Sequence, residues 1–158
     1  MLFRSKTKSA VYRAIVLSAL LYGVESWVVY KVTAHKLSAF MMRHLRQILN
    51  IKWWQFISNE KILTTTSLPG MYDILISRCL RWTGHVNRLD NTRLLYSQLT
   101  DGTRGIGRPK LRYNDTIKRN LKDCDIPLGS WLSLSRSRDG WRQLIRTRKT
   151  SSSATMDS

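Results

Sequence analysis

The most apolar stretch of this strongly basic sequence, residues 15–27 (IVLSALLYGVESW), constrains the fold more than any other feature. A helix that is apolar nearly all round must be buried on most sides, by the rest of the chain or by another partner. We expect the stretch to belong to a helix over residues 5–30 that is broken near Gly23. The packing partner of residues 15–27 decides whether the chain is a nucleic-acid binder or a membrane-anchored peptide.

Basic residues precede this stretch, as they do in a secretory signal peptide: Arg4, Lys6, Lys8 and Arg13. Tyr22, Gly23 and Glu25 fit that interpretation poorly, and the uncharged run is shorter than the roughly 20 residues that span a bilayer. We therefore expect an intracellular protein of nucleus or cytoplasm that does not enter a membrane. A small secreted or tethered peptide, with residues 1–34 as signal or anchor, is the alternative.

The charge balance is extreme, because 27 Lys and Arg residues face 10 Asp and Glu residues, for a formal net charge of +17. Such a surface favours nucleic acid or anionic membrane as partner. Two cysteines, Cys79 and Cys124, are too few for a disulfide framework and indicate a reducing compartment. The apolar content of 42% predicts a folded core.

Apolar residues recur three or four positions apart in several segments, which predicts helices. The expected helices cover residues 5–30, 33–50 with Thr33 as N-cap, a short one from Ser58 to about Thr66, 71–88, 92–99, 109–123 and 137–148. No strand alternation is convincing. We predict an all-α fold, an irregular bundle of about five to six helices with a glycine-rich basic loop (residues 102–110) and a disordered C-terminal tail. The expected regions are residues 1–100, 101–149 and 150–158.

The inner faces of these helices follow from the same spacing. We expect Phe40, Trp82 and Trp141 to lie on buried faces. Of the adjacent Trp53 and Trp54, we expect one to close the core and the other to lie half exposed, available to stack on a base, with core packing as the preferred role. Arg78, Arg81 and Arg88 are expected on the outer side of their helix.

The sequence contains no recognisable catalytic or metal-binding pattern. The histidines and cysteines lack the paired spacing of a zinc site, and no serine or cysteine nucleophile has a plausible partner set. The glycine-rich loop is not a P-loop, because Leu111 follows Lys110 where Ser or Thr would bind magnesium. We expect no enzyme, no cofactor, no metal and no small-molecule substrate.

With no active site in the sequence, the positively charged surface is the main functional signal. It predicts non-specific, salt-sensitive binding to the phosphate backbone of RNA or DNA. The residues expected to carry most of it are Arg104, Arg108, Lys110, Arg112, Lys118 and Arg119, with Arg43, Arg46 and Lys52 as a secondary patch. A second basic cluster lies between Arg136 and Lys149. The Gly107–Lys110 run is similar to the core of an AT-hook, but a basic loop before a helix is the preferred interpretation.

Six blocks occur in a set order along the chain. The first two are VL-x-x-LLYG-x-E-x-W, over residues 16–27, and LR-x-IL-x-I-x-W, over residues 45–53. The third is N-E-x-(I/L)-L, over residues 59–63, and the fourth is R-x-LRW-x-GHV-x-R, over residues 78–88. The last two are GRP-x-x-R-(W/Y)-x-D, over residues 107–115, and DR-x-x-WR, matched by Arg138, Trp141 and Arg142.

Together these blocks resemble the region after the polymerase palm in reverse transcriptases of non-LTR (LINE-type) retrotransposons. Ser137 stands where that family usually has Asp, and Tyr113 where Trp is commoner. The resemblance implies a thumb-like region over residues 1–100 and a basic post-thumb region over 101–149, which would grip a template–primer duplex. It implies no polymerase activity for this chain, because the palm with its metal-binding aspartates is not matched.

Two further expectations follow from the resemblance. The palm of a parent polymerase would be a partner, so we expect a conspicuous exposed apolar patch, of the size that marks an interface, over residues 15–27. Full burial of Leu17, Leu21 and Tyr22 together would count against this expectation. The alternative from a different class is a degraded transposon fragment without biochemical function, which would fold only partially.

Overall fold

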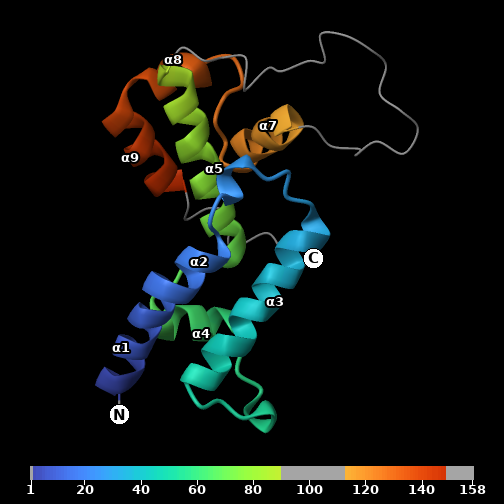
Figure 1. Ribbon diagram of the computed structural model, residues 1–158, viewed down its shortest axis with the longest axis vertical. Helices are drawn as coiled ribbons and strands as arrows, with labels where there is room; N and C mark the ends of the chain where they lie inside the picture. The colour runs from blue at the N-terminus through green and yellow to red at the C-terminus, as the bar shows by residue number, and fades with distance from the viewer. Residues whose placement is uncertain (1, 90–112, 149–158) are drawn as a thin grey trace, which may run out of the picture. The chain divides into compact units, whose positions relative to one another are not determined.

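The computed structural model describes residues 2–89 and 113–148, and every regular element in these two ranges is a helix (Figure 1). The predicted all-α class is confirmed. The chain divides into two compact units, the first made of Met1–Val24 and Tyr30–Ile74, the second of Glu25–Val29 and Leu75–Ser158. The expected helix 92–99, the glycine-rich loop and the C-terminal tail lie outside the described residues.

The opening apolar stretch forms the end of a helix and the turn that follows it. Helix α1 (Leu2–Val11) continues into a π-helical segment, η1 (Tyr12–Leu17), and then α2 (Ser18–Leu20). Gly23 has a φ of +68°, which a residue without Cβ adopts at no steric cost, and a short 3-10 turn follows, η2 (Val24–Ser26). The predicted break near Gly23 is confirmed, but the helix does not resume over residues 27–30.

Helix α3 (Lys31–Ile48) begins earlier than predicted, so the expectation that Thr33 is its N-cap is wrong. Tyr30 is the capping residue, with extended backbone and a carbonyl that accepts the Ala34 N–H at 3.0 Å. Helix α4 (Asn59–Thr66) begins as predicted, since the Ser58 hydroxyl accepts the Lys61 N–H at 3.3 Å. A 3-10 turn, η3 (Trp53–Gln55), lies between α3 and α4.

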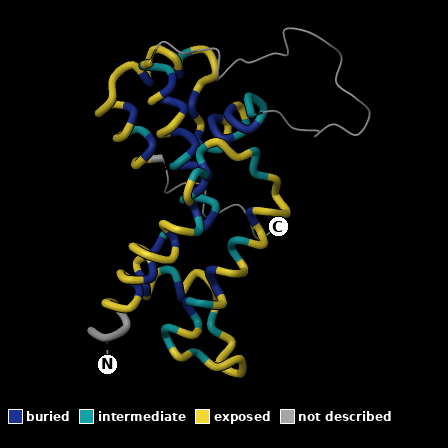
Figure 2. Tube along the Cα trace, viewed as in Figure 1, coloured by how far each residue is buried: buried dark blue, intermediate teal, exposed yellow. Residues whose placement is uncertain are grey.

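The core of the first unit forms where α1, α3 and α4 meet (Figures 1 and 2). Its fully buried side chains include Leu21, Met41, Leu45 and Ile62. Phe40, expected to be buried, is exposed, because the buried face of α3 turns toward Met42 and Ala34 instead. Within the two described ranges, no helix has the length and apolarity needed to cross a membrane.

The expectation that one of the two adjacent tryptophans closes the core is wrong. Trp53 is 81% exposed and Trp54 is 56% exposed, in the loop that joins α3 to α4. The opening stretch has a mixed outcome, because Leu17 and Leu21 are buried whereas Tyr22 is 85% exposed. Ile15 and Val16 of the same stretch are exposed as well, so the three named residues are not all buried and apolar side chains of this stretch remain at the surface.

The second unit contains most of α5 (Met71–Arg88), followed by α7 (Tyr113–Asp123), α8 (Trp131–Arg136) and α9 (Arg138–Arg148). Both ends of α5 lie where they were predicted, and α9 begins one residue after the predicted start. Helix α8 was not predicted, since its six residues, WLSLSR, are too few to show a helical period. Ser137, with extended backbone, separates α8 from α9.

The core of this unit is formed by the inner faces of these helices. Leu80, Ile117 and Leu121 are fully buried, and Trp141 is buried as predicted. Trp82 is partly exposed instead, since the buried face of α5 runs through Leu75, Leu80 and Val86.

Candidate functional site

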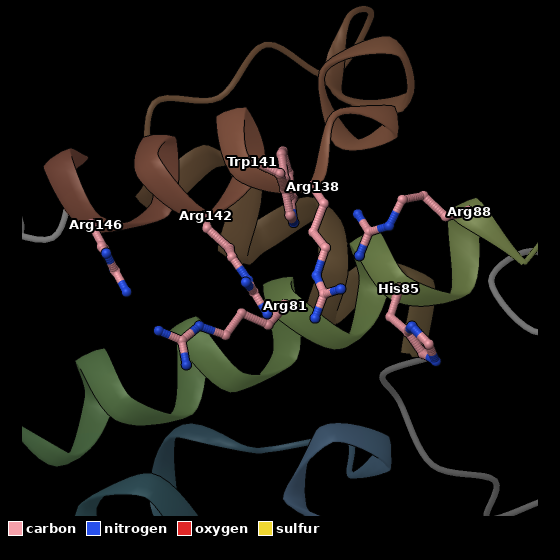
Figure 3. A pocket seen from close by; sticks show the side chains of 7 residues that line it. All are labelled: Arg81, His85, Arg88, Arg138, Trp141, Arg142 and Arg146. Carbon is pink, nitrogen blue, oxygen red and sulfur yellow. The ribbon is translucent and has the colours of Figure 1, made fainter.

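A pocket of about 490 Å³ lies in the second unit and is lined mainly by basic side chains of α5 and α9 (Figure 3). Seven residues line it: Arg81, His85, Arg88, Arg138, Trp141, Arg142 and Arg146. Five of them are arginines and none is acidic. We call this site the arginine pocket.

Regular helix geometry explains how these arginines come to share one pocket. On α9, Arg138, Arg142 and Arg146 follow each other at four-residue spacing, which places them in one stripe about 6 Å apart along the axis. On α5, Arg81 and Arg88 share a face with His85. Arg138 and Arg142 extend from α9 toward α5 (Figure 3).

Trp141 fixes α9 against α5 beneath the arginines. Its side chain is only 1% exposed, and its indole Nε1 donates a hydrogen bond to the Leu80 carbonyl at 2.9 Å. Gly84 makes this approach possible, since a Cβ built there would lie 2.6 Å from Trp141 Cδ1. The spacing of the two arginine stripes therefore depends on a tryptophan on one helix and a glycine on the other.

The end of α5 is held in a second place, by α8. Asn87 Nδ2 donates to the Leu132 carbonyl at 3.0 Å and to Ser135 Oγ at 2.6 Å. Arg88 Nη1 donates to the Ser135 carbonyl at 2.7 Å, so this arginine has a structural bond as well as a place in the pocket.

The guanidinium groups of the other four arginines make no hydrogen bond or ion pair within residues 2–89 and 113–148. Guanidinium groups stay protonated in proteins, so the pocket holds five like charges with no facing carboxylate. Such a site attracts anions, and planar guanidinium groups match phosphate by paired hydrogen bonds. Over residues 2–89 and 113–148, no three His, Cys, Asp or Glu side chains gather so that they could hold a metal ion.

A second set of contacts holds the segment Glu25–Val29 against α5 and α7. The Tyr113 hydroxyl donates to the Glu25 carbonyl at 2.7 Å, and Arg119 Nη2 donates to the Val29 carbonyl at 2.8 Å. Arg78 Nη1 lies 3.8 Å from Glu25 Oε1. The end of the opening apolar stretch is therefore an integral part of the second unit.

Burial changes the acidity of two groups beside this segment. It raises the pKa of the Cys79 thiol, and it raises the pKa of the Tyr113 phenol strongly. The two groups lie 4.0 Å apart, Sγ to Oη. Both are therefore protonated at neutral pH, and neither is an activated nucleophile or base.

The six residues predicted to carry most of the nucleic-acid binding have different outcomes. Arg104, Arg108, Lys110 and Arg112 lie outside the described residues. Lys118 is exposed on α7, whereas the next residue, Arg119, is half-buried and bonded to Val29. The guanidinium of Arg119 therefore holds the fold together, and its Nε is buried without a partner in the described structure.

The predicted secondary patch lies in the first unit. Arg43 is exposed on α3, and Lys52 is exposed at the start of the loop after it. Arg46 has a different environment, because its Nη2 donates to Asn59 Oδ1 at 2.7 Å and to the Ile57 carbonyl at 3.3 Å. Arg46 therefore ties the loop to the start of α4.

The arginine pocket is not among the residues predicted from sequence as the main site. The four-residue spacing of the arginines on α9 is a visible signal for one stripe. The sequence gives no such signal that Arg81 and Arg88 line the same pocket, because their place beside α9 depends on the contact between Trp141 and α5.

Comparison with known proteins gives one informative relative. The chain is 23% identical over 158 residues to an uncharacterized transposon-derived protein of Caenorhabditis elegans, in a match that covers 93% of this chain and 57% of that protein. The chain thus spans little more than half the length of this relative, and the similarity relates it to transposon-derived sequence. No protein-family model and no solved structure matches the chain.

Proposed function

We propose that this chain is the thumb and post-thumb part of a non-LTR retrotransposon reverse transcriptase, and that it holds RNA or DNA non-specifically by the backbone. The observation that carries the proposal is the arginine pocket, which presents five guanidinium groups and no carboxylate. The proposed role is to grip the nucleic acid, and the chemistry of polymerisation would belong to the palm of the parent polymerase.

The contacts between the sequence blocks support this assignment. Gly84, from the block over residues 78–88, receives Trp141 from the last block. Glu25, from the first block, contacts Arg78 and Tyr113 from two others. Residues from four of the six blocks therefore contact one another within the second unit, although they lie far apart in sequence.

The charge and the relative add two further lines of support. A net charge of +17 favours a polyanionic partner, and non-specific binding to nucleic acid needs little more than phosphate contacts. The relative is named as transposon-derived, which is the origin that the proposal requires.

A degraded transposon fragment without biochemical function is the second candidate, because the relative is itself uncharacterized and the identity is low. Folding separates the two candidates. A functional domain melts in one cooperative transition by circular dichroism, whereas a degraded fragment gives a gradual, non-cooperative loss of helix.

The proposed binding of nucleic acid by the arginine pocket is tested with two variants. One removes positive charge from the pocket, and the other removes the same charge from α1 and η1. The pocket variant is Arg81→Gln/Arg142→Gln/Arg146→Gln, and the control is Lys6→Gln/Lys8→Gln/Arg13→Gln, three exposed residues of α1 and η1. Each lowers the formal net charge from +17 to +14 (17 − 3).

Affinity for a labelled RNA or DNA duplex is measured by fluorescence anisotropy. The proposal predicts that the pocket variant loses about tenfold or more, and that the control loses no more than about two- to threefold. Equal losses would mean that binding follows net charge alone and that the pocket has no special role.

A further inference from the structure

The loop between α3 and α4 presents a row of aromatic side chains to solvent. Trp53, Trp54 and Phe56 are 81%, 56% and 86% exposed. Large aromatic rings are usually drawn into a core, and three such rings exposed within four residues are unusual for a loop with no partner. We call residues 52–56 the aromatic tip.

The backbone of the aromatic tip is fixed by hydrogen bonds. The Lys52 N–H donates to Gln55 Oε1 at 3.1 Å, and the Gln55 N–H donates to the Lys52 carbonyl at 3.1 Å. Before the tip, the Ile51 N–H donates to the Arg46 carbonyl at 2.9 Å. After it, the Arg46 guanidinium holds Ile57 and Asn59. The rings are therefore presented by an ordered turn, which lowers the entropy cost of binding a partner.

The two indoles do not cover each other. Their centroids lie 5.8 Å apart and their planes are at 86°, an edge-to-face pair. Because an edge-to-face pair leaves most of the ring faces uncovered, the tip offers flat π-surfaces to a planar partner.

The charge around the tip restricts what that partner can be. Residues 42–66, the tip and the ten residues on either side of it, contain four Lys and Arg residues and one acidic residue, Glu60. Exposed aromatic faces set among positive charges are the combination with which proteins bind single-stranded nucleic acid, where bases stack and phosphates meet cations. An anionic membrane surface would meet the charges but has no planar group to stack on the rings.

We propose that the aromatic tip binds unpaired bases of single-stranded RNA or DNA by stacking on Trp53 and Trp54. The site goes beyond the proposed function, which invokes the backbone alone, and it rests on that function only in that the chain meets nucleic acid. In a duplex the bases are already stacked on each other, so the tip favours single strands.

The test uses the full chain and two labelled probes of equal length, an oligouridine strand and an RNA duplex. The variants are Trp53→Ala/Trp54→Ala and the ring-retaining Trp53→Phe/Trp54→Phe. Tyr22→Ala is the matched control, since Tyr22 is an exposed aromatic residue in a different turn of the same unit.

Loss of stacking weakens binding roughly 5- to 100-fold for each base that loses its ring. The alanine variant is therefore expected to weaken strand binding by that range or more and to change duplex binding less than about twofold. The phenylalanine variant keeps most of the affinity, and Tyr22→Ala is without effect. All variants keep the wild-type melting temperature, because the rings removed are exposed.

Three outcomes would overturn the proposal. Strand affinity could be unchanged in the alanine variant, or strand and duplex affinity could fall equally. Third, the variant could lose binding to phosphatidylserine-containing vesicles while keeping strand affinity, which would assign the tip to membranes. Failure of the backbone proposal gives a different pattern, in which the pocket variant binds like its charge-matched control while the tip variant still loses strand affinity.

Discussion

The indole of Trp141 lies directly against Gly84, with its Nε1 bonded to the Leu80 carbonyl one turn earlier on α5. This single contact brings α9 close enough to α5 for the arginines of both helices to line one pocket. The contact is tight, so it leaves no room for a side chain at position 84.

Gly84→Ala is expected to destabilise the chain by about 1–3 kcal/mol, because the new methyl group would collide with the indole and push α9 away. The measurement is urea unfolding followed by circular dichroism. Gly129→Ala is the control, since a Cβ there meets nothing within 4 Å, and it should change stability by no more than about 0.5 kcal/mol. Equal stabilities for the two variants would contradict the described packing.

Arg46 and Arg43 lie on the same helix and are expected to respond differently to substitution. Arg46→Ala removes two hydrogen bonds from the loop after α3, one of them to the Ile57 carbonyl, and should cost about 1–2 kcal/mol of unfolding free energy. Arg43→Ala, at an exposed position, should stay within about 0.5 kcal/mol of wild type. The measurement is the midpoint of urea unfolding for each variant. A lower midpoint for Arg43→Ala than for Arg46→Ala would show that the hydrogen bonds of Arg46 do not stabilise the fold.

Alkaline pH is expected to destabilise the second unit. Burial raises the pKa of the Cys79 thiol above its ordinary 9.0 and that of the Tyr113 phenol above its ordinary 10.0. Above these values the unfolded chain loses protons that the folded chain keeps, so the unfolding free energy falls as pH rises. The loss has a ceiling of about 1.4 kcal/mol per pH unit for Cys79, and solvent screening makes it smaller for the half-buried Tyr113.

Melting temperatures between neutral and strongly alkaline pH test this directly. The curve should be insensitive to these two groups below their ordinary pKa values and fall above them. Tyr113→Phe should lower stability at neutral pH, through loss of the bond to Glu25, but flatten the fall above pH 10.0. Tyr22→Phe, which alters an exposed phenol, is the control and should leave the curve unchanged.

Local signals in the sequence predict most of the helices. Ser58 caps α4 as its side chain and position predict, and α5 runs from the residue after Gly70 to Arg88. Gly23 breaks the opening helix because its backbone is left-handed. Each of these outcomes depends on residues within one or two turns, which is the range over which sequence patterns are informative.

The errors concern features that helical periodicity does not encode. Trp53 and Trp54 are of a residue type that is usually buried, yet both are exposed. The loop that carries them is held by the hydrogen bonds from Arg46 to Asn59 and from Lys52 to Gln55. The pocket depends on a bond between Trp141 and Leu80, 61 positions apart. The charge of α9 could be predicted, but its pairing with Arg81 and Arg88 could not.

The salt dependence of binding tests the central claim, that the arginine pocket holds nucleic-acid phosphates. For duplex DNA, each phosphate contact contributes about −0.9 to the slope of log affinity against log salt concentration. Removing Arg81, Arg142 and Arg146 should therefore make the slope shallower by about 2 to 3, whereas the charge-matched control at Lys6, Lys8 and Arg13 should keep the wild-type slope. Identical slopes for the pocket variant and the control would contradict the account.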